Sequence, residues 1–342
     1  MIADLLARLA DPRPLSAPES RRVLDRLVAP SLEEAERPAL LLALSARPSD
    51  PAELAHLAAG LRARARPFPH PARERPVDLC GSGGAPRASF NVSTASAFVV
   101  AAAGVPVLKH GNRSARGRCG SSDLLLALGL PVDRNVAFAR ACYDRERLAF
   151  LHAPLFHPVL ARLADARRIL GVPTVLNRLG PLAHPAGVTR QVTGVPTPGD
   201  TGPTAAALRA LGVRRGVTMA SADGRDEFSP RRTTHAVFWS GSSVRRRRID
   251  PSRFLLGDER TGSWAALPPA DAAEETDRIF AGGGGARRGS ILLTSGAALW
   301  AAGTVPSFAA GVARAREALD GGGAEEKLAA LRAIAERFRG TP

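Results

Sequence analysis

Glycines, hydroxyl side chains and cationic side chains are concentrated in one stretch of the sequence, residues 78–123. The run at 81–84 reads Gly-Ser-Gly-Gly, and the missing side chains let backbone N–H groups approach a ligand closely. Residues 91–94 read Asn-Val-Ser-Thr, and residues 109–113 read Lys-His-Gly-Asn-Arg. Hydrogen-bond donors and positive charges in this order indicate a site for a phosphorylated, anionic ligand.

Two short strands and one helix are predicted to bring these motifs together. We expect strands at 77–80 and 105–108, and a helix at 95–103 whose start is capped by the Asn-Val-Ser-Thr motif. A helix N-terminus favours an anion. Two strand ends and a helix N-terminus therefore converge on one spot, as in α/β proteins that hold phosphorylated ligands.

Each motif also has a simpler interpretation. A lone Gly-x-Gly-Gly is more often a tight turn than a phosphate cradle, and Asn-x-Ser-Thr is usually only a helix cap. Lys-His-Gly-Asn-Arg alone could be a solvated polar loop. Their order and their spacing after two predicted strands favour the binding interpretation.

Two adjacent acids, Asp226 and Glu227, lie in a loop after a predicted strand at 215–220. Adjacent acids on a loop are usually only solvated charge. In proteins, however, Mg²⁺ is bound by one or two carboxylates together with substrate phosphates. Because this pair belongs to the same α/β region as the phosphate motifs, the sequence favours a magnesium site here.

The motifs together resemble the anthranilate phosphoribosyltransferase family, whose signatures are Gly-Thr-Gly-Gly-Asp, Asn-x-Ser-Thr, Lys-His-Gly-Asn-Arg and Gly-Ser-Ala-Asp. The last signature corresponds to Gly-Ser-Ser-Asp at 120–123, and the resemblance covers nearly the whole chain. It implies transfer of the phosphoribosyl group from 5-phosphoribosyl 1-pyrophosphate (PRPP) to the amine of anthranilate. The products would be N-(5-phosphoribosyl)anthranilate and pyrophosphate, in tryptophan biosynthesis. The resemblance also implies Mg²⁺ and a homodimer.

The resemblance assigns roles to individual residues. The side chains expected to act in catalysis are Lys109, Asn112 and Arg167, and the metal site is expected to involve Ser93, Asp226 and Glu227. Substrate contacts are expected from Gly81, Gly84, Ser89, Asn91, Ser93, Thr94, Lys109, His110, Asn112, Ser121 and Arg167. Arg167 would hold the carboxylate of anthranilate, since a guanidinium binds a carboxylate with two hydrogen bonds. His110 either contacts the acceptor or is structural.

Several positions differ from the family pattern. Ala85 replaces the acid of the first signature, Leu126 replaces a glutamate, and His184 replaces an asparagine. Arg116 stands where a serine is usual. These differences leave open the number of metal ions, the rate of turnover and the identity of the acceptor.

The expected fold is nucleoside phosphorylase/phosphoribosyltransferase-like, an α/β architecture in which a small N-terminal helical domain joins a larger domain with a mostly parallel central sheet. We expect the helical domain at 1–66 and the α/β domain at 76–342, separated by a proline-rich connector. Part of 155–190 is expected to join the helical domain in space. Within the helices, Ser16 and Glu19 have the spacing of a capping box.

Further elements follow from periodicity and turn residues. We expect a helix at 156–170, strands at 191–195 and 215–220, and a hairpin at 235–249 whose second arm carries four consecutive arginines. At least two of these arginines should face solvent, as on a protected sheet edge. The glycine-rich segment at 281–289 is expected to be a loop.

The charge of the chain leaves one other function class open. The net charge is +15, which could indicate a nucleic-acid partner. Codon bias explains an arginine-rich composition equally well, so we expect no nucleic-acid partner. Three cysteines, without metal-like spacing, indicate reduced thiols in a cytoplasmic protein. We expect no signal peptide and no membrane span.

Two alternatives therefore accompany the main hypothesis. One is a related phosphoribosyltransferase for another aromatic acceptor, which an altered pocket around His152, His157 and Arg167 would indicate. The other is a relative that has lost catalysis and binds nucleic acid through its basic surface, although the intact site residues argue against it.

Overall fold

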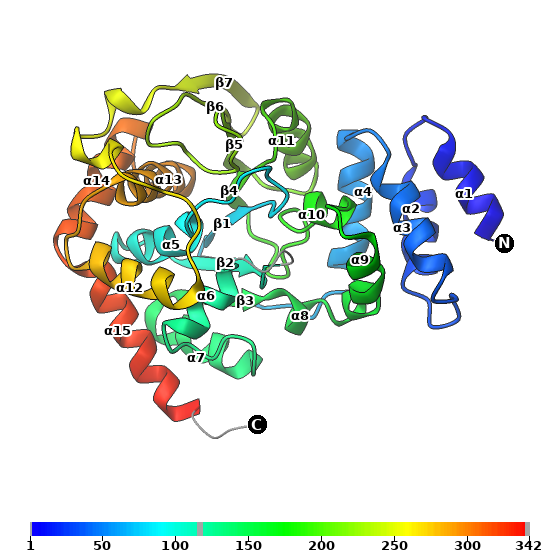
Figure 1. The fold of residues 1–342 in the computed structure, drawn as a ribbon, viewed down its shortest axis with the longest axis horizontal. Helices are drawn as coiled ribbons and strands as arrows, with labels where there is room; N and C mark the ends of the chain where they lie inside the picture. The colour runs from blue at the N-terminus through cyan, green and yellow to red at the C-terminus, as the bar shows by residue number, and fades with distance from the viewer. Residues whose placement is uncertain (1, 115–118, 339–342) are drawn as a thin grey trace.

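The computed structural model describes residues 2–114 and 119–338, and a seven-stranded sheet lies at the centre of its larger part (Figure 1). The strand order is β3-β2-β1-β4-β5-β6-β7. Strands β3, β2, β1, β4 and β5 run parallel, whereas β6 and β7 are antiparallel to their neighbours. The predicted mostly parallel sheet is therefore confirmed. Its strands are β1 (Val77–Gly81), β2 (Val107–Gly111), β3 (Leu148–His152), β4 (Arg190–Gly194), β5 (Arg215–Ser221), β6 (Thr234–Ser240) and β7 (Ser243–Ile249).

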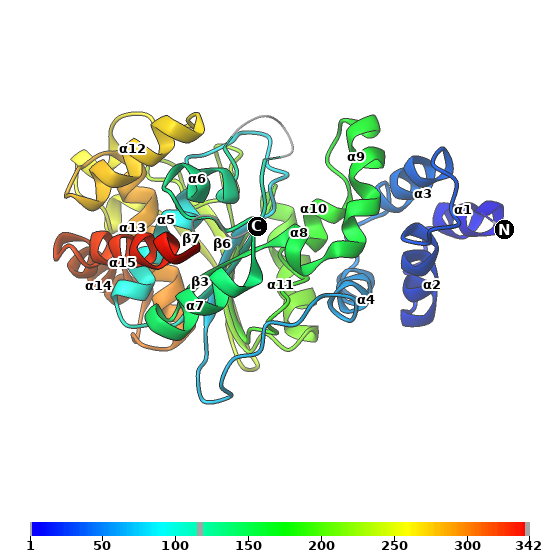
Figure 2. The same cartoon turned by 90° about the horizontal axis from the view of Figure 1, so that it is seen from below.

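Helices cover both faces of this sheet (Figures 1 and 2). On one face α5 (Val92–Ala102) and α13 (Ala286–Ala302) pack against the strands, while α11 (Thr201–Ala210) packs on the other face against β5 and β6. Outside α5 and α13 lie α14 (Phe308–Asp320) and α15 (Gly323–Ala335). The remaining helices of this part are α6 (Ser121–Ala127), α7 (Val136–Glu146) and α12 (Pro269–Phe280).

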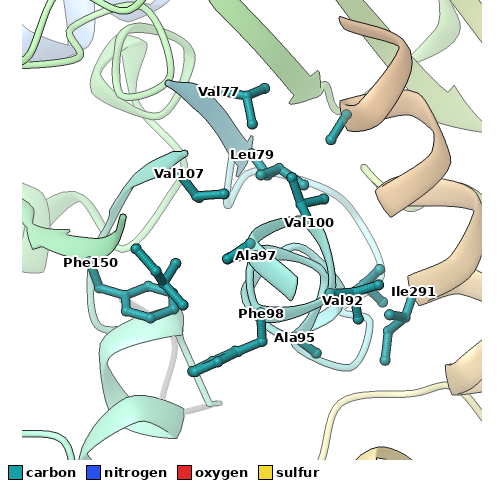
Figure 3. Close-up of a cluster of buried hydrophobic side chains, with 14 of the residues drawn as sticks. Val77, Leu79, Val92, Ala95, Ala97, Phe98, Val100, Val107, Phe150 and Ile291 are labelled. Carbon is teal, nitrogen blue, oxygen red and sulfur yellow. The ribbon is translucent and has the colours of Figure 1, made fainter. Parts of the chain in front are cut away.

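The main hydrophobic core lies between the sheet and α5. Figure 3 shows Val77 and Leu79 of β1 with Val107 of β2 on the sheet side, and Phe98 and Val100 on the helix side. Helix α5 is apolar nearly all round because the sheet lies on one side of it and other helices on the opposite side. This burial fixes the start of α5 relative to the ends of the strands.

The N-terminal helices form a second hydrophobic cluster together with α9 (Ala164–Leu170), α10 (Val175–Leu179) and α11. The predicted capping box is confirmed, since Ser16 accepts from the Glu19 backbone and Glu19 accepts from the Ser16 backbone. Between the α/β part and α9 lies the short helix α8 (Ala153–Phe156). The N-terminal helices are α1 (Ile2–Ala10), α2 (Ala17–Leu27), α3 (Glu36–Ser45) and α4 (Pro51–Arg62).

Two predicted boundaries near the phosphate motifs were wrong. Helix α5 begins at Val92 and not at residue 95, so Ser93 and Thr94 lie in its first turn. The second strand runs from Val107 to Gly111, because its pairing with β3 continues through the Lys-His-Gly segment. The motif therefore lies on the strand itself, and its first residues are fixed by the sheet.

Two further predictions were wrong. The expected helix at 156–170 is a 3₁₀ turn at Pro158–Leu163 followed by α9, since Pro158 has no N–H to continue α8. The expected loop at 281–289 is shorter, because α13 begins at Ala286. Gly285 lies directly before this helix and has a φ of 105°, which favours glycine.

The predicted hairpin is confirmed as β6 and β7, which turn at Ser240 and Ser243. The four arginines of β7, residues 245–248, are all exposed at the edge of the sheet. Among the described residues, none of the helices has the length and apolar character needed to cross a bilayer.

Candidate active site

The predicted motifs meet at the edge of the sheet where the parallel strands have their carboxyl ends. The glycine-rich loop follows β1, the Lys-His-Gly-Asn-Arg motif ends β2, and the acidic pair follows β5. The order of the strands reverses at β1, which has β2 on one side and β4 on the other. Open α/β sheets bind ligands in the crevice at such a switch point.

Asp226 is held against the glycine-rich loop. Its Oδ2 accepts hydrogen bonds from Ser82 Oγ at 3.1 Å and from the Gly83 backbone N–H at 3.2 Å. A Cβ on Gly81 would lie 2.8 Å from the same oxygen, and a Cβ on Gly194 would overlap the Asp226 carbonyl oxygen. Glycines at the ends of β1 and β4 therefore let this carboxylate lie directly beside the loop.

Glu227 lies at the start of α5. Its Oε1 accepts a hydrogen bond from the Ser93 backbone at 3.3 Å, and its buried Oε2 has no partner among the described residues. Asp226 and Glu227 are only 9% and 5% exposed. Burial, with the neighbouring Asp226 charge, raises the pKa of Glu227 to about 8, and burial also raises the pKa of Asp226. Two adjacent buried carboxylates, one with an unpartnered oxygen, fit a divalent cation.

Lys109 brings a positive charge to the same site. It is 3% exposed, and within residues 2–114 and 119–338 it makes no ion pair. Burial lowers its pKa, while the neighbouring Asp78 charge acts in the opposite direction. Asp78 itself is buried on β1, and burial raises its pKa to about 6. The Lys109 ammonium is thus buried without an ion pair among the described residues, which favours an anionic ligand.

Gly111 brings Lys109 and Ser121 together at the end of β2. A Cβ on Gly111 would lie 3.6 Å from Lys109 Nζ and would overlap Ser121 Oγ. Ser121 Oγ donates a hydrogen bond to the Asn112 carbonyl at 3.1 Å, and the Asn112 Oδ1 accepts from the Arg113 backbone at 2.7 Å. An ammonium group and a hydroxyl group therefore lie beside each other where the strand ends.

Three other predicted residues, Ser89, Asn91 and Thr94, lie just before α5 or in its first turn. Ser89 pairs with Ala265 in an isolated bridge, and Asn91 Nδ2 donates to the Cys119 carbonyl at 3.0 Å instead of capping α5. Thr94 is buried in the first turn of α5. Asn91 thus ties the start of α5 to the segment before α6, which the interpretation as a cap did not foresee.

His110 belongs to a cluster of buried histidines behind the site. Its ring lies 5.2 Å from that of His157 and 5.7 Å from that of His184, measured between ring centroids. His184 Nε2 lies 2.8 Å from the Leu108 carbonyl, and its Nδ1 accepts from the Ala186 backbone. His184 therefore donates from Nε2 and ties its loop to β2. Burial lowers the pKa of all three histidines, which favours their neutral form.

Arg167 is the predicted residue for which the structure shows no contact with the rest of the site. It lies on α9, which packs against α3, and its side chain is half-buried. Burial lowers its pKa, and it makes no ion pair with the part of the chain that the structure describes. An unpaired guanidinium of this kind can bind a carboxylate.

Asn177 was missed by the sequence analysis. It lies on α10, and its Nδ2 donates to the Gly83 carbonyl at 3.4 Å, so the helical region touches the glycine-rich loop directly. The capping spacing from Thr174 was the available signal. Of the departures from the family pattern, Ala85 follows this loop, Leu126 lies on α6, and Arg116 is outside the described residues.

The raised pKa of Glu227 predicts how stability depends on pH. Because its pKa rises from 4.5 to about 8 on folding, the contribution of Glu227 to the free energy of unfolding should fall as the pH rises between these values. Without divalent cations, we expect the change in Tm over this range to be less negative in Glu227→Gln than in the parent protein. Thermal unfolding followed by circular dichroism measures this. The exposed Glu326→Gln is the control, and equal slopes in both variants would contradict the assignment.

The fold and this site define a glycosyl transferase with two parts. Residues 73–325 match the a/b domain of the glycosyl transferase family, and residues 3–65 match the helical bundle domain of that family. A helical bundle followed by an α/β sheet is the arrangement found here.

Similar proteins show which family of glycosyl transferases this chain belongs to. The chain is 38% identical to anthranilate phosphoribosyltransferase 2 of Streptomyces coelicolor, over 91% of this chain and 93% of that protein. It superposes on anthranilate phosphoribosyltransferase of Thermus thermophilus with a TM-score of 0.88 and 34% identity, covering 97% and 99% of the two chains. The chain belongs to the anthranilate phosphoribosyltransferase family. The Saccharomyces cerevisiae enzyme in complex with PRPP and Mg has the same fold, with a TM-score of 0.82, 21% identity and 98% coverage of both chains.

Proposed function

We propose that this protein transfers the phosphoribosyl group from PRPP to the amine of anthranilate, in tryptophan biosynthesis. The observation that carries the proposal is the buried pair Asp226 and Glu227, which touches the glycine-rich loop and the start of α5 with Lys109 nearby. Carboxylates for a cation, backbone N–H groups for phosphates and an unpaired ammonium group are what a pyrophosphate ester needs.

The proposed PRPP site lies at the switch point between β1 and β4. Asp226 and Glu227 would hold Mg²⁺, with Ser93 beside them, and the ion would neutralise charge on the pyrophosphate. Lys109 and Ser121 would bind the phosphates of the substrate. The other proposed contacts come from Gly81, Gly84, Ser89, Asn91 and Thr94.

The chemistry requires mainly positioning and charge stabilisation. The amine nitrogen forms a bond to C1 of the ribosyl ring, while the bond from C1 to the pyrophosphate oxygen breaks and its electron pair leaves with pyrophosphate. The nitrogen then loses a proton. Lys109 would stabilise negative charge on the departing group, and its burial without an ion pair among the described residues supports this role.

The acceptor is proposed to lie between Asn112 and Arg167. The half-buried guanidinium of Arg167 would bind the carboxylate of anthranilate, and Asn112 and His110 would contact the acceptor from β2. Other aromatic acceptors remain the second candidate, because the buried His157 and the neighbouring His152 also lie in this region.

The proposal includes the organisation of the protein in the cell. We propose a helical domain at 1–66 completed by part of 155–190, an α/β domain at 76–342, and a homodimer in the cytoplasm. The shared hydrophobic cluster of the N-terminal helices with α9 and α10 supports the helical domain. The three cysteines, which are all free and buried, agree with a reducing compartment.

The test is the loss of anthranilate fluorescence in the presence of PRPP and Mg²⁺. We expect consumption to require all three components, with pyrophosphate released in equal amount. Binding of PRPP without consumption of anthranilate would favour another aromatic acceptor. Failure to bind either substrate, together with salt-dependent binding of DNA or RNA, would favour the nucleic-acid-binding alternative.

A further inference from the structure

A cavity of about 200 Å³ lies between the β6–β7 hairpin and the region where α13 ends and α14 begins. Its lining includes Ser240, the last residue of β6, which pairs with Arg215, the first residue of β5. The cavity is therefore at the amino end of β5, whereas Asp226 and Glu227 follow the carboxyl end of that strand. The cavity and the candidate active site lie at opposite ends of the strand.

Four aromatic residues line this cavity: Phe238, Trp239, Trp300 and Phe308. Phe238 of β6 meets Trp300 of α13 edge to face at 5.1 Å between ring centroids, and it meets Phe308 of α14 at 5.8 Å. In proteins an apolar cavity of about 150 Å³ is large enough to hold benzene. The cavity can therefore take a single aromatic ring with a small substituent.

The polar part of the lining is cationic. Arg245 and Arg247 line the cavity, and the lining contains no acidic residue. The Arg247 guanidinium lies 5.6 Å from the Phe238 ring centroid, and the Arg215 guanidinium lies 4.3 Å from that of Trp300. In the described part of the chain neither Arg245 nor Arg247 makes an ion pair, so the charges of these two lining arginines are available to a ligand.

We propose that this cavity binds a small aromatic carboxylate, independently of the proposed phosphoribosyl transfer. The ring packs among Phe238, Trp300 and Phe308, where dispersion and edge-to-face contacts stabilise it. The carboxylate pairs with Arg245 and Arg247, which lie two residues apart on β7 and so share one face of the strand.

The alternation of side chains on β7 supplies a matched control. Arg246 and Arg248 lie on the opposite face, and the Arg246 guanidinium lies beside Gly202 of α11. Changing Arg245 and Arg247 to glutamine removes the same charge from the same strand as changing Arg246 and Arg248. Only the first pair lines the cavity.

The experiment is a calorimetric titration with benzoate, which has no amine and cannot accept a phosphoribosyl group. An Arg167→Gln background weakens binding at the proposed acceptor site. In that background we expect Arg245→Gln/Arg247→Gln to lower benzoate affinity at least about tenfold, and Arg246→Gln/Arg248→Gln to change it less than about twofold.

Three outcomes would overturn the proposal. These are no benzoate binding to the parent Arg167→Gln protein, equal losses in the two arginine pairs, or inorganic phosphate binding as tightly as benzoate. The last would show a general anion site without a requirement for the ring. Because no step uses PRPP or Mg²⁺, failure here leaves the proposed transferase function unaffected.

Discussion

Changing Asp226 to asparagine together with Glu227 to glutamine is expected to lower kcat for phosphoribosyl transfer at least about a hundredfold. Both substitutions keep the size of the side chain, and an asparagine Oδ1 can still accept the hydrogen bonds of Ser82 and Gly83. They remove the two negative charges that would hold Mg²⁺. Steady-state kinetics at saturating PRPP measures the effect.

A neighbouring acid provides the control for this variant. Asp223 lies in the same loop but accepts hydrogen bonds from Ser221 and Ser229 and pairs with Arg225. Asp223→Asn should therefore change kcat by less than about threefold, because its partners are Ser221, Ser229 and Arg225 and not the glycine-rich loop or the start of α5. Activity of the double variant equal to that of Asp223→Asn would contradict the proposed metal site. The Tm of the double variant should not fall above about pH 8, where both buried carboxylates are charged and the substitutions remove their repulsion.

The second large effect is expected from Gly194→Ala. A Cβ at this position would overlap the carbonyl carbon and oxygen of Asp226, and both groups are backbone atoms that cannot rotate away. The end of β4 and the Asp226 loop must then separate. We expect a loss of about 1–3 kcal/mol in the free energy of unfolding and a large loss of activity. Urea denaturation and the anthranilate assay measure the two effects.

Gly257→Ala is the matched substitution for Gly194→Ala. No atom lies within 4 Å of a Cβ built on Gly257, and its backbone is in the ordinary right-handed helical region. Alanine there should leave stability within about 0.5 kcal/mol and activity unchanged. Equal stabilities of the two variants would show that the close approach of Asp226 to β4 is not required.

The positions of the main site residues could be predicted from the sequence because they depend on strand ends. Apolar strands that stop at glycine or at a polar cluster place their next residues at one edge of a parallel sheet. This reasoning brought the 81–84 loop, Lys109 and the acidic pair together, and the structure confirms that Asp226 touches this loop and Glu227 the start of α5.

Contacts that depend on packing between distant segments could not be predicted. Asn177 reaches the Gly83 carbonyl from a different hydrophobic cluster, and His184 reaches the Leu108 carbonyl across a loop. No local periodicity encodes either contact. The start of α13 at Ala286 was also missed. A glycine-rich run predicts a loop, but it does not show at which residue the loop ends and a helix begins.

The order of the strands also has a consequence for folding. The hairpin of β6 and β7 joins residues close in the chain, and it can form early. The pairing of β1 with β4 joins residues as distant as Val77 and Arg190, so it must close a long loop before it gains stability. The proposed metal site lies across this same pairing. A partly folded chain that lacks this pairing also lacks the proposed metal site.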